Sequence, residues 1–156
     1  QWSLVGSEMC IRDRSKLTMS EMDRFRGKNI GIVFQKPHFI NSLTVKENLQ
    51  LAQYISKKID KTRISSLLES LGIEDKANKK TLNLSQGEKQ RVAIALAIVN
   101  SPKLILADEP TSSLDDLNCN KVINLLKNQA AKYKAKLIII THDYRLKKHF
   151  KNTLSL

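Results

Sequence analysis

Two short runs of continuous apolar residues constrain this fold more than any other feature of the sequence. KLILADEP (103–110) and KLIIITHD (136–143) both have the length of a strand and end in charged or polar residues. Strands that are apolar at every position are typical of parallel sheets, which are buried on both faces. Between them, LNCNKVINLLKNQAAKY (117–133) has the apolar spacing of a helix. This order predicts an α/β domain with a mostly parallel sheet and helices on both faces.

The same alternation continues on both sides of this segment. IGIVF (30–34) predicts a further strand, and TLSL (153–156) predicts a last one. Thr44 and Glu47 have the spacing of a capping box at a helix start, and Gly72 is placed to end the next helix. Three helical patterns follow the first strand in the chain: LTVKENLQLAQYI, DKTRISSLLESLGI and LSQGEKQRVAIALAIVN.

The first 14 residues, QWSLVGSEMCIRDR, differ from the remainder of the chain. They have no helical or strand period and lack the apolar core of a signal peptide. We therefore expect residues 1–14 to be a non-native or disordered leader, followed by one α/β domain over residues 15–156.

Polar side chains follow three of the predicted strands. Gln35 comes directly after IGIVF, Asp108 and Glu109 end the second run, and residues 141–143 (Thr-His-Asp) end the third. Ligands of open α/β sheets bind at the carboxyl ends of the strands. A carboxamide, two carboxylates and an imidazole are therefore expected to converge on one edge of the sheet. Each of these groups alone has an ordinary structural explanation, but the three strand ends together favour a site.

These residue types suit the chemistry of phosphate transfer. A carboxylate at the end of an apolar strand, here Asp108, is how P-loop ATPases hold Mg²⁺, directly or through water. Glu109 lies one residue further and can polarise a water that attacks a γ-phosphate. His142 can donate a hydrogen bond to that phosphate, and Gln35 can contact the Mg²⁺ or the water.

A second candidate site begins the helix pattern at LSQGEKQR (84–91). Ser85 and the backbone of Gly87 open this helix, whose amino terminus attracts anions. Taken alone, this pattern is better explained by an ordinary helix cap. The presence of LILADEPTSSLD about twenty residues later favours phosphate binding.

Together these segments resemble the motifs of an ABC-type ATPase. LSQGEKQR resembles the signature motif, LILADEP the Walker B strand, and SSLD the D-loop. IGIVFQ resembles the Q-loop, IIITHD resembles the H-switch, and all occur in the order of that family. The resemblance covers residues 15–156 and implies a P-loop NTPase fold with an added α-helical subdomain. FRGKNIGIVFQKPHFINSLTVKENLQLA is most similar to ATPases of lipoprotein release or of macrolide and peptide export.

The resemblance implies a role for each matching residue, with ATP and Mg²⁺ as cofactors. Asp108 would hold Mg²⁺ through water, with Gln35 also touching the metal and coupling it to the permease. Glu109 would be the general base, and His142 would contact the γ-phosphate. Four further residues would bind the γ-phosphate of ATP held by the opposite subunit: Ser85, Gln86, Gly87 and Glu88. Asp115 would link the two sites across the dimer.

The resemblance also implies partners and a location. Such subunits pair with a second ATPase subunit, identical or different, and act on transmembrane permease subunits. They are peripheral proteins of the cytoplasmic face of the inner membrane. Residues 40–84 would form the helical subdomain and 85–156 the motif-bearing part, and KPHFINSLTVKENL (36–49) would dock on the permease.

Charge and composition bear on the alternatives. The net charge of +12 suits an anionic membrane surface, and with only 5% aromatic residues we expect no nucleic-acid partner. A soluble ABC ATPase of translation or DNA repair usually carries two cassettes or a long coiled coil, and the sequence has no heptad run. A non-catalytic ABC-like binding protein would not need both Glu109 and His142.

Three features depart from the family pattern. Gln86 replaces a glycine of the signature, and Leu96 stands where an arginine is common. The third is larger, because no G-x-x-x-x-G-K-[ST] segment occurs among the 156 residues. We therefore expect an amino-terminally truncated ATPase domain whose sheet has an unfilled slot and exposed apolar edges. This chain by itself is expected neither to bind ATP tightly nor to hydrolyse it.

Overall fold

The computed structural model describes residues 18–112 and 114–154. The predicted leader, residues 1–14, lies outside the described residues and stays a prediction. Thr153 and Leu154 are not part of a strand, and the remainder of the predicted last strand lies outside the described residues. Among the described helices, none has the length and apolar character needed to span a membrane.

The sheet has three parallel strands in the order β1-β2-β3. They are β1 (Ile30–Val33), β2 (Leu104–Asp108) and β3 (Lys136–Ile140). Val33 pairs with Ala107, and Asp108 pairs with Ile140. The parallel sheet predicted from the apolar runs is therefore confirmed, and its register brings the three polar strand ends to the same edge.

The strands differ from the prediction in one respect. An unfilled slot was expected in the sheet, but β1, β2 and β3 pair directly with one another throughout the described residues. The positions without a described neighbour are the outer edges of β1 and β3. Main-chain groups of β2 are therefore satisfied on both sides, which stabilises the strand that carries Asp108.

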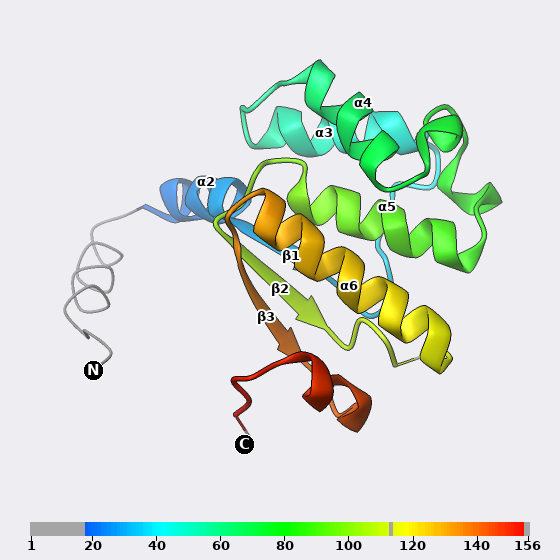
Figure 1. Cartoon of the computed structure of the whole chain (residues 1–156). Coiled ribbons are helices and arrows are strands. Elements are labelled where there is room, and N and C mark those ends of the chain that lie inside the picture. Colours follow the sequence, from blue (N-terminus) through cyan, green and yellow to red (C-terminus); the bar gives the residue numbers. More distant parts are fainter. Residues whose placement is uncertain (1–17, 113, 155–156) are drawn as a thin grey trace.

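One face of the sheet is buried under two helices, α5 (Gln86–Ile98) and α6 (Asp116–Lys132). Figure 1 shows α6 lying along the strands and α5 beside it. Ile105 and Ala107 are fully buried in this layer. At Gly31 the backbone of α5 approaches so closely that an added Cβ would lie 1.9 Å from the carbonyl oxygen of Ala97. Only glycine fits at this point of contact between strand and helix.

Replacing Gly31 by Ala is therefore expected to lower the free energy of unfolding by about 3 kcal/mol, because backbone has to move to admit the methyl group. Urea unfolding followed by circular dichroism measures the change. Gly27→Ala is the matched control, since a Cβ there meets nothing within 4 Å. An unchanged unfolding midpoint for Gly31→Ala would show that α5 does not lie against β1 in this way.

The opposite face of the sheet is open among the described residues. Ile32, Ile138 and Ile140 point to this face and are 43%, 49% and 61% exposed. Successive side chains of a strand point to opposite faces, so covering one face leaves every second residue exposed. The expected burial on both faces, with helices on both, does not hold for the described residues, although the parallel α/β fold does.

A helical layer lies on the far side of α5 from the strands (Figure 1). It consists of α3 (Val45–Ile55), α4 (Lys61–Ser70) and two short 3-10 helices, η1 (Glu74–Lys76) and η2 (Thr81–Asn83). The predicted capping box holds: the Thr44 side chain accepts from the Glu47 backbone, and Glu47 accepts from the Thr44 backbone. These elements share one apolar core with α5 and the sheet: Leu49, Leu67, Leu71, Ile94 and Ile98 are among its buried residues.

Besides η1 and η2, two described helices had no counterpart in the sequence prediction. The helix α2 (Met19–Asn29) precedes β1 and buries none of its residues, so its sequence lacks an apolar stripe. Its start is fixed by a capping box between Thr18 and Glu21. The second is η3 (Tyr144–His149), which follows β3 and packs Leu146 against Ile123 of α6.

Candidate functional site

The carboxyl ends of the three strands form a hydrogen-bonded group. The Thr141 hydroxyl donates to Oε2 of Glu109 at 3.0 Å, and the backbone N–H of His142 donates to Oε1 at 2.8 Å. Gln35 Nε2 donates to Ser112 Oγ at 2.9 Å, and Ser112 Oγ donates to the Glu109 carbonyl at 3.2 Å. The structure thus brings together the residues predicted after all three strands.

Glu109 has an unusual backbone. Its φ is +45°, in the left-handed region that non-glycine residues rarely adopt. The backbone N–H of Glu109 donates to the Ile140 carbonyl at 2.9 Å, which extends the β2–β3 pairing by one residue before the chain turns. Strain of this kind persists where surrounding contacts hold it, and it concentrates at functional sites. Here it turns the Glu109 carboxylate toward residues 141 and 142.

Asp108 and the imidazole of His142 are differently placed from Glu109. Both residues are exposed, and within the described part of the chain neither side chain has a hydrogen-bond or ion-pair partner. No group of three or more His, Cys, Asp or Glu residues that could hold a metal occurs among the described residues. Asp108 is therefore a single carboxylate at the strand end, while Glu109 is anchored on both of its oxygens.

The predicted signature residues form a helix cap at the start of α5. The Ser85 backbone N–H donates to Glu88 Oε2 at 2.8 Å, and the Glu88 N–H donates to Ser85 Oγ. These hydrogen bonds from Ser85 lower the pKa of the Glu88 carboxyl. Lys76 lies 3.4 Å from Glu88 and adds a cation beside it. Ser85 and Glu88 thus bond to one another and to Lys76 rather than to the Glu109 group.

Asp115 caps the neighbouring helix α6. Its carboxylate accepts from the Asn118 backbone at 2.8 Å and from the Asn118 side chain at 2.9 Å, and these bonds lower its pKa. Asp115 and the start of α5 border one groove of about 340 Å³. Its lining comes from both helices: Gln86, Gly87, Gln90, Arg91, Leu114, Asp115, Asn118, Lys121, Val122 and Leu125. Gln90 also donates to the Pro110 carbonyl at 3.3 Å, so this groove adjoins the loop that follows Glu109.

Three residues around the site escaped sequence reasoning: Thr111, Ser112 and Arg145. Hydroxyl residues after an Asp-Glu pair and an arginine in a lysine-rich segment carry no distinctive pattern. Each of them has a partner 29 to 77 residues away, as in the bonds of Arg145 to Asp116, of Thr111 to Asp143 and of Gln35 to Ser112. Only the folded chain brings them together.

Asp143 is held as a carboxylate by its neighbours. Arg145 hydrogen-bonds it on both oxygens, and this contact lowers the Asp143 pKa from 3.8 to about 2. A lowered folded-state pKa stabilises the fold above pH 3.8 and loses that effect as the pH falls through about 2. We therefore expect part of the free energy of unfolding to disappear between about pH 4 and pH 2.

Asp143→Asn tests this expectation because its amide does not titrate. Urea midpoints of the wild type and Asp143→Asn are compared at pH 6, 4 and 2.5. The difference between the two proteins is expected to shrink toward acid pH. A difference that is constant over this range would show that the Asp143–Arg145 pair does not titrate in it.

A parallel α/β sheet with an Asp-Glu pair and a histidine at adjacent strand ends, beside a capped helix, is typical of domains of the P-loop NTPase class. The family model described as "ABC transporter" matches residues 4–112, which is more than half of the chain. The chain therefore belongs to the ABC transporter ATP-binding family. Its fold is that of the ABC ATPase cassette.

Curated relatives and solved structures agree with this assignment. The chain is 38% identical over 141 residues to the lipoprotein-releasing system ATP-binding protein LolD 1 of Chlorobium luteolum, covering 88% of this chain and 60% of that protein. It is 44% identical over 124 residues to the putative hemin import ATP-binding protein HrtA of Staphylococcus aureus, covering 78% and 56%. The dimeric structure of MJ0796, a bacterial ABC transporter cassette, superposes with a TM-score of 0.72 at 34% identity, covering 85% and 60%. The chain thus spans about 60% of the length of the curated relatives that it matches.

Proposed function

We propose that this chain belongs to the ATP-binding and ATP-hydrolysing subunit of an ABC transporter. The subunit powers a membrane permease of the lipoprotein-release or macrolide and peptide export type, and is peripheral at the cytoplasmic face of the inner membrane. Relatives named for lipoprotein release support this type of cargo. Another relative is named for hemin import, so the type of cargo is proposed separately from the ATPase function. The observation that carries the proposal is the anchored Glu109 carboxylate between Thr141 and His142.

Glu109 is the general base in this proposal. Two hydrogen bonds, one to each oxygen, fix the orientation of its carboxylate. A carboxylate held in this way orients an attacking water and takes its proton as the bond to phosphorus forms. The exposed imidazole of His142, the residue directly after Thr141, then donates a hydrogen bond to the γ-phosphate oxygens.

The donors at the strand ends fit Mg²⁺. This ion keeps several waters and takes one or two protein oxygens besides substrate phosphates, so a single carboxylate is sufficient. Asp108 would hold it through water, with the side-chain oxygen of Gln35 as a second ligand. When bound, the metal neutralises negative charge on the phosphates. The amide nitrogen of Gln35 is already engaged by Ser112, which leaves its oxygen to face the metal.

The groove between α5 and α6 is the surface on which we propose that a second ATPase subunit binds. Its lining includes Gln86, Gly87 and Asp115, and a Cβ added at Gly87 would meet nothing within 4 Å. We propose that Ser85, together with these residues and Glu88, contacts ATP held by a second ATPase subunit. A solved relative described as a dimeric cassette supports this pairing.

The proposed function is tested on a complete cassette, meaning residues 15–156 preceded by the amino-terminal segment of a relative that includes its phosphate-binding loop. Mg²⁺-dependent release of phosphate from ATP is measured for the wild type and for Glu109→Gln. Hydrolysis by the wild type and its loss in the variant are expected. A complete cassette that binds ATP without hydrolysing it would favour the non-catalytic alternative.

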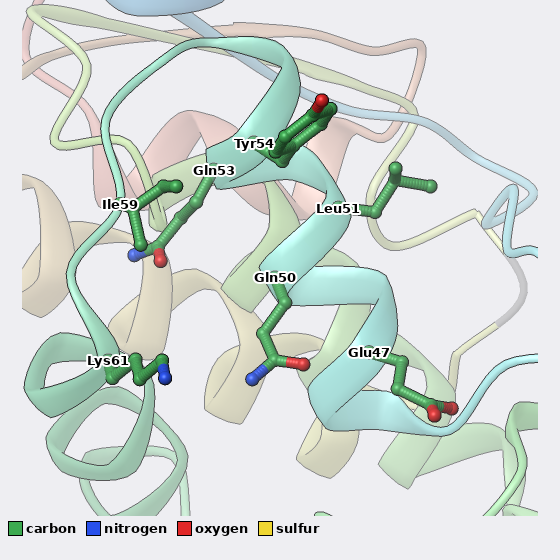
Figure 2. A pocket seen from close by; sticks show the side chains of 7 residues that line it. All are labelled: Glu47, Gln50, Leu51, Gln53, Tyr54, Ile59 and Lys61. Atoms are coloured by element: carbon green, nitrogen blue, oxygen red, sulfur yellow. The ribbon is translucent and has the colours of Figure 1, made fainter.

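The permease is proposed to dock on the helical layer. A groove of about 360 Å³ lies along α3 and the segment that leads into α4. Figure 2 shows the side chains that line it. Tyr54 and Ile59, 70% and 66% exposed, give it an apolar rim. Its shape is fixed by Gln53, a buried amide that bonds to both the N–H and the carbonyl of Asp60. The groove adjoins residues 36–49, the surface expected from the sequence to meet the permease.

Tyr54→Asp is expected to weaken association with the permease at least tenfold, because an interface centred on an aromatic residue loses about 2 kcal/mol or more when a charge replaces it. The complete cassette is co-expressed with permease subunits of the lipoprotein-releasing type and the retained fraction is measured. Basal hydrolysis of ATP should be unchanged, since Tyr54 belongs to α3, which lies on the far side of α5 from the strands (Figure 1). Met19→Asp, at an exposed residue of α2, is the control, and equal retention of both variants would contradict this docking surface.

A further inference from the structure

Arg145 joins two loops that the proposed reaction uses. Its guanidinium holds the Asp143 carboxylate on both oxygens, with Nε–Oδ1 at 2.8 Å and Nη2–Oδ2 at 2.7 Å. On the other side, Nη1 donates to Asp116 Oδ1 at 2.6 Å, and both Nη atoms donate to the Leu114 carbonyl at 3.2 Å. Asp143 belongs to the loop after β3, Leu114 belongs to the loop after β2, and Asp116 is the first residue of α6. One side chain therefore ties these loops to each other.

Asp143 strengthens this tie through a second partner. Its carboxylate accepts from the Thr111 hydroxyl at 3.0 Å, and Thr111 is fully buried. Thr111 lies two residues after Glu109, while Leu114 lies five residues after it. The loop that leaves Glu109 is consequently held at its start through Asp143 and at its end directly by Arg145. The Asp143 side chain is only 11% exposed, so solvent does not compete strongly for these bonds.

The tie continues into the Glu109 group. The backbone N–H of Asp143 donates to the Thr141 hydroxyl at 2.9 Å, and that hydroxyl donates to Glu109. The neighbouring N–H of His142 donates to the other oxygen of the same carboxylate. Glu109 is thus connected to Asp143 through Thr141 and His142, while its strained backbone is held by Ser112 Oγ, which donates to the Glu109 carbonyl at 3.2 Å.

We propose that Arg145 is a positioning residue for ATP hydrolysis. Acting through Asp143 and Thr111, it holds the loop after β2 against the loop after β3, so that Glu109 and the His142 imidazole face the same phosphate. This proposal rests on the proposed function, in which Glu109 is the base. Neither the sequence motifs nor the roles implied by the family resemblance include Arg145.

The geometry requires an arginine rather than any cation. A planar guanidinium reaches two oxygens of one carboxylate and a carbonyl on the opposite side at once, whereas an ammonium group is a single point charge. Arg145→Lys keeps the charge and loses the fork, and Arg145→Met keeps the length and loses both. Lys148→Met, at an exposed lysine of the same 3-10 helix, is the matched control.

The experiment measures kcat and KM for ATP in the complete cassette. Arg145→Met is expected to lower kcat by about 10- to 100-fold with a change in KM of less than about threefold, because a small displacement of the base affects the chemical step far more than binding. Arg145→Lys should recover only part of the loss, and Lys148→Met should have the wild-type kcat. In the Glu109→Gln background, Arg145→Met should cause no further loss, because Arg145 acts through Glu109.

Each contrary outcome is distinguishable. A wild-type kcat for folded Arg145→Met would overturn the proposal, as would a full additional loss in the Glu109→Gln background. If Arg145→Met fails to fold, Arg145→Lys decides, and a wild-type kcat for that variant would overturn it. If Glu109→Gln itself retains hydrolysis, the proposed function fails first, independently of Arg145.

Discussion

Replacing Glu109 by Gln in the complete cassette is expected to slow ATP hydrolysis by at least about 100-fold, the usual effect of removing a general base. The amide has the same shape as the carboxylate but cannot take a proton from water. Its oxygen can still accept from the His142 N–H, and its NH2 group can donate to the Thr141 hydroxyl, so the local geometry survives. The variant is therefore expected to keep ATP bound and to lock the dimer.

Phosphate release and ATP retention are measured on the same preparation. In gel filtration with labelled ATP, the nucleotide should elute together with a dimer of the Glu109→Gln variant. Much less nucleotide should elute together with the wild-type protein. Glu69→Gln, at an exposed acid of α4, is the control and should turn over normally. Turnover by Glu109→Gln above about 3% of the wild-type rate would show that Glu109 is not the base.

Replacing His142 by Ala is expected to lower the rate by about 100- to 1000-fold, the cost of losing one donor to developing charge. The structure makes this a specific test of the imidazole. His142 anchors Glu109 through its backbone N–H, which alanine keeps, and its ring has no partner among the described residues. Glu109 should thus stay in place while the contact to the γ-phosphate is lost, with only a modest loss of ATP affinity.

The comparison requires single-turnover rates together with ATP affinity from calorimetry. His149→Ala is the matched control, since that imidazole bonds Asn120 in another part of the fold. A rate within about threefold of wild type for His142→Ala would give the imidazole a structural role only. A parallel loss of affinity and rate would instead mean that His142 acts in binding.

The chain fixes its local elements by its own residues. The starts of α3 and α5 follow from Thr44 and Ser85, because a capping box needs only four consecutive residues. The apolar runs likewise define β2 and β3. In contrast, α2 has no apolar stripe, and the sequence therefore did not predict it. The sequence also did not predict that one face of the sheet is open, because residues on that face, such as Ile138, are apolar.

The candidate site divides in the same way. Gln35, Asp108, Glu109 and His142 were found because parallel strands place their carboxyl ends on one edge, a rule that needs only the strand order along the chain. The hydrogen bonds that orient these groups were not found. Whether Ser85 caps a helix or meets a phosphate also stayed open, and the structure shows the cap without excluding the contact to a second subunit.

The sequence by itself determined the family motifs, the alternation of strands and helices, and the residue types at the strand ends, because each depends on neighbours within a few positions. The tertiary structure alone decided that Glu109 is turned by a positive φ and anchored on both oxygens, while Asp108 is left exposed. It also decided that Arg145 ties the two loops together. These arrangements join residues about thirty positions apart, and hydrogen bonds over such separations exist only after the sheet and its register have formed.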